Sequence, residues 1–250
     1  MFYNLALNFT GIYSKEDVEK EKLIYVDCTD ISGTDMYCSK EAEYIIKQRI
    51  EKFGPCGIHF LDSGNYHYVT KFFAEQIQEP FSLVLFDYHD DMNKRTAYEL
   101  TDCGSWARDI FFNHPYLKQL IIIGPDQKQL EITDIHIKEK LVCISIQELE
   151  SKKAEVKLKQ IKTDVPVYIS IDKDVLSESC AVTNWNQGRM SLKMLEDLLT
   201  LFLVESEVIG VDICGEYSPS AGNFSEFVHA EKLNKEANNT LFRYIRSFIQ

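Results

Sequence analysis

Acidic and imidazole side chains directly follow two apolar segments of this 250-residue chain, residues 83–86 and 167–171. The side chains concerned are Asp87, His89, Asp91, Asp172 and Asp174. Alternation along an extended chain places the members of each set on one face. Neighbouring carboxylates at the end of a buried strand are costly unless a cation neutralises them or protons stay bound. We therefore predict a metal site whose oxygen and nitrogen donors suit Mn²⁺, with iron, cobalt and zinc as alternatives.

The elements that must position these clusters are short apolar runs separated by amphipathic stretches. Runs that are apolar on both faces predict buried strands at residues 23–26, 58–61, 83–86, 120–123, 141–144, 167–171 and 208–213. Helical spacing of apolar residues occupies 39–53, 66–78, 146–161, 191–204 and 234–249. This alternation predicts an α/β fold, a three-layer sandwich with a mostly parallel central sheet. Ligand sites in such sheets lie at the carboxyl ends of strands, where both clusters fall.

Composition limits the classes of partner. The chain is 45% hydrophobic, and we expect one domain over residues 1–250. A net charge of −12, with 39 acidic against 27 basic residues and no basic run, argues against nucleic acid. No apolar run reaches the ~18 residues of a membrane span, and the N-terminus does not resemble a signal peptide, so we expect a cytoplasmic protein. The seven cysteines form no C-x-x-C pair, which predicts reduced thiols.

Three segments together resemble a known family, the ureohydrolases, which include arginase and agmatinase. Residues 87–91, Asp-Tyr-His-Asp-Asp, resemble the family's D-A-H-x-D motif, and residues 170–174, Ser-Ile-Asp-Lys-Asp, resemble S-x-D-x-D. Residues 64–67, Gly-Asn-Tyr-His, are similar to G-G-D-H. The resemblance extends from about Gly57 to Pro219 and implies an arginase/deacetylase-like fold.

The resemblance also implies a ligand set for two divalent metal ions, most simply Mn²⁺. The ligands of one ion would be His67, Asp87, Asp91 and Asp172. Those of the other would be Asp87, His89, Asp172 and Asp174, so that Asp87 and Asp172 bridge. The activity implied is hydrolysis of a non-peptide C–N bond in a small guanidine, amidine or amide by a metal-bridging hydroxide.

The substrate side of the site is predicted from looser matches. Residues 211–219 are similar to the family's D-x-x-E-x-N-P segment, with one extra residue before Glu216. Glu216 and Asp91 are therefore the candidate catalytic residues, and we expect Glu216 to face a planar cationic substrate across the metal pair. Asn93, Trp106 and Glu216 are the candidate substrate-binding residues. Trp106 has packing in the core as its alternative role.

Other segments depart from the family pattern. Residues 100–108 lack the histidine that relays protons in arginases and agmatinases, and His114 is expected at the surface. The loop after Asp174 is also altered, so the substrate stays open. A non-catalytic metal-binding member of the family and a deacetylase-type amidohydrolase are the alternatives, although no His-His pair of the deacetylase kind occurs. We expect Cys103, Cys180 and Cys214 to be small buried thiols. The family resemblance also raises a homo-oligomer as an expectation.

Overall fold

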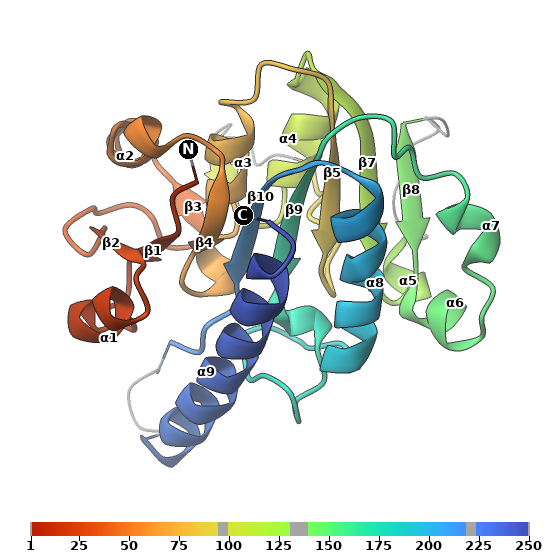
Figure 1. Ribbon diagram of the computed structural model, residues 1–250. Helices are drawn as coiled ribbons and strands as arrows, with labels where there is room; N and C mark the ends of the chain where they lie inside the picture. Colours follow the sequence, from red (N-terminus) through yellow and green to blue (C-terminus); the bar gives the residue numbers. More distant parts are fainter. Residues whose placement is uncertain (1, 95–99, 131–139, 219–223, 250) are drawn as a thin grey trace.

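The computed structural model describes residues 2–94, 100–130, 140–218 and 224–249. An eight-stranded sheet runs through its centre in the order β2-β1-β4-β10-β9-β5-β7-β8, and all neighbouring strands are parallel (Figure 1). The strands are β1 (Leu5–Asn8), β2 (Ile24–Asp27), β4 (Gly57–Phe60), β5 (Phe81–Phe86), β7 (Leu117–Ile123), β8 (Leu141–Ile144), β9 (Val167–Asp172) and β10 (Val208–Cys214). The predicted α/β sandwich with a parallel sheet is confirmed.

Both faces of the sheet are covered by helices, so its central strands are apolar throughout. On β5, Leu83 and Leu85 pack into one core, while Val84 and Phe86 pack into the other. The first core includes α2 (Lys40–Ile50), α3 (Val69–Ala74) and α4 (Trp106–Asn113). The second includes α8 (Leu192–Glu205) and α9 (Phe224–Arg246), which lie together on one side of the sheet in Figure 1. Period-two alternation therefore decides which core each strand residue joins.

Several element boundaries differ from the sequence prediction. The helix expected at 146–161 is two short helices, α6 (Ile146–Glu150) and α7 (Glu155–Leu158), because the chain turns at Lys152, whose φ is 57°. Strand β1 was not predicted, and it lies between β2 and β4 in the sheet. The remaining elements are α1 (Lys15–Lys20), α5 (Gln127–Leu130), a two-stranded sheet of β3 (Tyr37–Cys38) and β6 (Thr101–Asp102), and the 3₁₀ turns η1 (Glu51–Phe53), η2 (Gly64–Tyr66) and η3 (Lys173–Val175). In the described residues, no helix is long and apolar enough to cross a membrane.

The sheet order brings the predicted clusters together. Strands β10, β9 and β5 are consecutive neighbours, and β4 lies on the other side of β10. Because the strands are parallel, their carboxyl ends meet at one edge. Cys214, the last residue of β10, is in register with Asp172, the last residue of β9. The segments after β4, β5 and β9, which carry the family-like motifs, therefore converge at this edge.

Candidate metal centre

The six predicted ligands line one open pocket of about 650 Å³ at this edge of the sheet. These residues are His67, Asp87, His89, Asp91, Asp172 and Asp174. All but His89 are buried. The structure thus brings together donors that lie more than one hundred positions apart in the sequence.

His67 lies at the centre of the first group of donors. It follows the 3₁₀ turn η2, and its Nδ1 is 3.2 Å from an Asp87 oxygen and 3.1 Å from an Asp91 oxygen. On the other side of the ring, Nε2 is 2.8 Å from the Ser170 hydroxyl, which fixes the ring plane. His67, Asp87 and Asp91 offer donor atoms within 4.8 Å of one another. Such a group can hold a divalent ion, with Ser170 as the partner that orients the imidazole.

A second group consists of Asp87, His89 and Asp174, and its donor atoms also lie within 4.8 Å of one another. The Nδ1 atom of His89 is 2.8 Å from Asp174 Oδ2 and 3.6 Å from Asp87 Oδ1. The backbone N–H of Tyr88 donates to the other oxygen of Asp174 at 3.0 Å. Asp87 belongs to both groups, which is the arrangement that two ions sharing one carboxylate require.

The third group was missed by sequence reasoning, because it contains a cysteine. His67, Asp172 and Cys214 offer donor atoms within 4.8 Å of one another. The Cys214 thiol donates to Asp172 Oδ2 at 3.1 Å, and the residue is 1% exposed. The interpretation of Cys214 as a buried thiol is correct for its burial but omitted its neighbours. Its place at the end of an apolar strand, like that of Asp172, was the signal available in the sequence.

Protein charges do not balance the carboxylates of this pocket. Five aspartates, four of them predicted ligands, face only two histidines, and none of the described residues that line the pocket is a lysine or an arginine. Even with both imidazoles protonated, the six side chains would carry a net charge of −2. Burying uncompensated charge is expensive, so such a cluster requires either bound protons or cations. The donor set therefore fits a pair of divalent ions.

The pKa directions in the metal-free protein express the same imbalance. Burial raises the pKa of Asp91 and Asp172, and burial together with the charge of Asp87 raises the pKa of Asp174 to about 7. Burial alone would lower the pKa of His89, but its hydrogen bonds to Asp174 and Asp87 outweigh that effect and raise the pKa to about 12. The cluster thus holds protons where cations would otherwise reside.

Trp106 does not line the metal pocket, so its prediction as a substrate-binding residue is wrong. The residue is fully buried at the start of α4, and its indole N–H donates to Asp91 Oδ2. Its ring also lies 4.8 Å from that of His67, measured between centroids. Asp91 itself has a left-handed backbone, with a φ of 48°. Trp106 therefore orients the Asp91 carboxylate from within the core, and its alternative role of packing in the core is confirmed.

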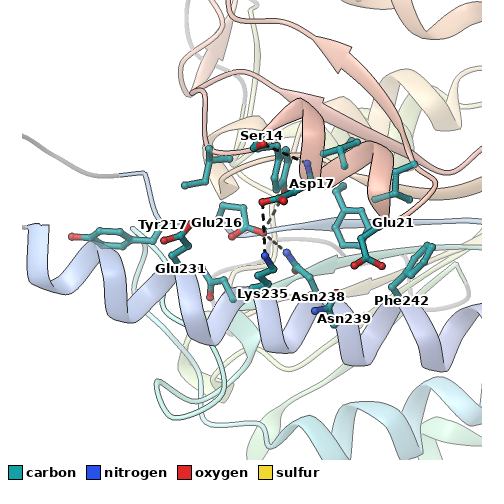
Figure 2. Close-up of a pocket in the computed structure, with 17 residues that line it drawn as sticks. Ser14, Asp17, Glu21, Glu216, Tyr217, Glu231, Lys235, Asn238, Asn239 and Phe242 are labelled. Atoms are coloured by element: carbon teal, nitrogen blue, oxygen red, sulfur yellow. Dashed lines mark hydrogen bonds and ion pairs between the residues drawn. The ribbon is translucent and has the colours of Figure 1, made fainter.

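Glu216 does not face the metal pocket either, which corrects the prediction that it points at the metal pair. Its Oε1 atom accepts hydrogen bonds from Lys173 Nζ at 2.7 Å and Asn238 Nδ2 at 2.6 Å. Figure 2 shows it in a different pocket, beside Asn238 and Lys235 of α9. The physical reason is the backbone at Gly215, whose φ of 95° turns the chain away from the end of β10. A Cβ at Gly215 would lie 2.6 Å from Asp172 Oδ1, so only glycine fits there.

The remaining predicted residues have mixed outcomes. Asn93 lines the metal pocket, and its backbone N–H donates to Gly104 O at 3.0 Å. His114 is buried rather than at the surface, with Nε2 3.0 Å from Ala74 O. Trp185, from the altered loop after Asp174, forms part of the pocket wall and was not predicted there. Its indole N–H donates to Asn65 at 2.8 Å, and its ring lies edge-on to that of His89.

Comparison with known proteins agrees with this geometry. Residues 12–232 match the model of the arginase family. The chain is also 30% identical, over 94% of its length and 88% of the relative's, to an uncharacterized protein of Thermotoga maritima. The chain therefore belongs to the arginase family.

Solved structures show the same fold at low sequence identity. Arginase from Bacillus subtilis superposes with a TM-score of 0.63 at 13% identity, covering 98% of both chains. Proclavaminate amidino hydrolase from Streptomyces clavuligerus superposes with a TM-score of 0.59 at 16% identity, covering 89% of this chain and 75% of its own. These likenesses establish the arginase fold.

Proposed function

We propose that this protein is a binuclear metal hydrolase that cleaves a non-peptide C–N bond in a small guanidine, amidine or amide. One observation carries the proposal: four aspartates and two histidines meet at one pocket without a lysine or arginine among the described residues that line it. Carboxylate clusters of this kind are costly to stability, and they are typical of functional sites. Membership of the arginase family supports the same function.

The residues proposed to hold the ions are His67, Asp87, His89, Asp91, Asp172 and Asp174. A bound pair of divalent ions supplies a water of lowered pKa and polarises the bond to be cleaved. Mn²⁺ is the first choice for loading. All five residues of the two donor groups that share Asp87 are aspartates or histidines, and hard to borderline ions accept carboxylate and imidazole ligands. Asp91 is held by Trp106, so its orientation is set before any ion binds.

Substrate recognition is proposed to involve Asp102 in place of Glu216. Among the described residues of the pocket, Asp102 is the carboxylate outside the six-residue donor set. Its two oxygens accept hydrogen bonds from Gly104 N at 3.0 Å and Ser105 Oγ at 2.7 Å, which hold it in place. Asn93 and Trp185 line the same pocket. A cationic substrate would thus be able to contact the carboxylate of Asp102, the amide of Asn93 and the aromatic ring of Trp185.

A non-catalytic metal-binding role is the second candidate, and two observations favour it. No histidine other than His67 and His89 lines the pocket within the described ranges, so the structure offers no relay imidazole there. The Glu216 carboxylate, which the sequence pattern placed beside the substrate, is bound to Lys173 instead. Loss of a general acid typically lowers a rate by ~10²-fold or more.

One experiment separates the two roles. Purified protein is loaded with Mn²⁺, its metal content is measured, and it is tested for release of ammonia or urea from a panel of guanidines, amidines and amides. The hydrolase proposal requires turnover that Asp172→Asn removes. Stoichiometric metal binding with no turnover on the whole panel would favour the non-catalytic role, and an absence of bindable metal would exclude both. Asp102→Asn should weaken turnover of cationic substrates more than that of neutral amides.

A further inference from the structure

We infer that Cys214 supplies a sulfur ligand to the ion held by His67 and Asp172, and that this ion is Zn²⁺, Co²⁺ or Fe²⁺ in preference to Mn²⁺. The inference rests on the proposed function, since it concerns one ion of the same pair. It adds a donor of different chemistry to a site that the sequence motifs describe with oxygen and nitrogen alone.

The position of Cys214 is set by the sheet and not by a loop. The residue ends β10 and is in register with Asp172 at the end of β9, so the two side chains leave neighbouring strands side by side. The thiol sulfur is 3.1 Å from Asp172 Oδ2, and the same oxygen is 3.7 Å from His67 Nδ1. Sulfur, oxygen and nitrogen thus surround one small region between β4, β9 and β10.

The backbone on both sides of this group packs closely against the Asp172 carboxylate. Gly64 and Gly215 flank that carboxylate, and a Cβ at Gly64 would lie 2.8 Å from Asp172 Oδ2. A Cβ at Gly215 would lie 2.6 Å from Asp172 Oδ1. Both glycines therefore let the backbone approach the carboxylate, which holds Asp172 in place beside His67 and Cys214.

The chemistry of the donors predicts the preference for metal. Thiolate is a soft ligand that selects zinc and related ions, whereas Mn²⁺ favours carboxylate and water. To act as a ligand, the thiol would release its proton to solvent. The sulfur would then face the ion in place of its present hydrogen bond to Asp172. Cys214, His67 and Asp172 would give a mixed sulfur, nitrogen and oxygen set, which is three of the four donors of a tetrahedral zinc site, and Asp87 and Asp91 lie on the other side of His67 Nδ1.

Titration of the full-length metal-free protein with Co²⁺ tests this ligand directly. A thiolate ligand produces a sulfur-to-cobalt charge-transfer band in the near ultraviolet, whereas histidine and carboxylate ligands produce only the weak visible bands of cobalt. We expect both features in the wild-type protein. In Cys214→Ser, the charge-transfer band should disappear while the visible bands remain. Cys103→Ser is the matched control, because Cys103 lines the metal pocket but belongs to none of the three donor groups, and it should keep the band.

The metal preference is measured by competition. Loss of a direct ligand should lower Zn²⁺ affinity at least as much as the ~10–100-fold typical for loss of a ligand's hydrogen-bond partner. The affinity for Mn²⁺ should fall much less. Equal losses for both ions would contradict the preference.

X-ray absorption at the zinc edge of the wild-type protein gives an answer even if Cys214→Ser does not fold. One sulfur at about 2.3 Å is expected, and a shell with only nitrogen and oxygen at about 2.0–2.2 Å would overturn the inference. The two proposals fail in different ways. Visible cobalt bands without a charge-transfer band would remove Cys214 as a ligand and leave the proposed function intact. If Mn²⁺ bound while neither cobalt nor zinc did, the inference alone would be overturned, and if no divalent ion bound at all, both would be excluded.

Discussion

Two pockets lie beside the carboxyl end of β10, and their carboxylates are compensated in opposite ways. In the metal pocket, Asp87, Asp91, Asp172 and Asp174 face only His67 and His89. At the other pocket, Glu216 is paired with the fully buried ammonium of Lys173. It also accepts a hydrogen bond from Asn238, which lies beside it in Figure 2. The negative charge of a carboxylate that is paired with a lysine is compensated without any ligand. The charge of a carboxylate cluster that has no lysine is compensated only when cations or protons bind. The difference identifies which strand-end acids are structural and which are available for function.

Adjacent residues of one strand end supply both pockets. Asp172 faces the metal pocket, whereas Lys173, the next residue, reaches the opposite face of the sheet and meets α9 through Asn238. The pairing of Lys173 with Glu216 therefore ties the end of β9 to the segment after β10 and to α9. We expect this contact to stabilise the fold that presents the metal donors, without binding the ions itself.

The largest effect expected from breaking the metal pocket comes from Asp172→Asn. Asp172 is proposed to hold both ions, and a bound metal contributes several kcal/mol to catalysis, so activity should fall by ~10³-fold or more. The measurement is the rate of hydrolysis together with metal content. Asp197→Asn, at an exposed acid of α8, is the control and should leave both unchanged. Full activity in Asp172→Asn would refute the assigned ligand set.

Breaking the second pocket with Lys173→Met should affect stability and not metal binding. Lys173 and Glu216 are 0% and 6% exposed in their side chains, and removing one partner of a buried ion pair costs about 3–5 kcal/mol. The measurement is the free energy of unfolding in urea. Adding Glu216→Gln should recover part of the loss, because it removes the uncompensated charge. A fall in metal stoichiometry in the folded variant would show that the two pockets are not separate.

Metal binding itself should stabilise the protein through the first pocket alone. A ligand at 100 times its dissociation constant stabilises the folded state by about 2.7 kcal/mol. For a chain of this size, that corresponds to an increase in Tm of roughly 5–10 °C. Thermal unfolding with and without added metal measures the effect, and a chelator should reverse it. The increase should persist in Lys173→Met and vanish in Asp172→Asn.

The smallest effect is expected from Trp106→Phe, which keeps an aromatic ring near His67 but removes the indole N–H that Asp91 accepts. Metal affinity should fall by ~10–100-fold, as is typical when a ligand loses its orienting hydrogen bond. The preference among substrates should not change, because Trp106 does not line the pocket. An altered preference would restore Trp106 as a substrate-binding residue.

The sequence by itself determined the parallel α/β fold and the six acidic and imidazole residues that meet in the metal pocket. The fold and five of these residues follow from local rules, since alternation assigns each strand residue to a face and parallel strands end at a common edge. His67 was added by the resemblance to the ureohydrolase family. Strand β1 was missed although it is no shorter than β2, β4 and β8, which were predicted. The motifs after β4, β5 and β9 were informative because each stands directly after an apolar strand.

Only the tertiary structure decided the directions of Glu216, Trp106 and Cys214. One positive φ at Gly215 sends Glu216 to α9 and Lys173, and no pattern in the sequence specifies that angle. Trp106 reaches Asp91 because the start of α4 packs behind the pocket. Cys214 meets Asp172 because β9 and β10 are neighbours, although about forty positions separate them in the chain. Strand order and a single backbone turn are global properties, so these contacts could not be derived from local spacing.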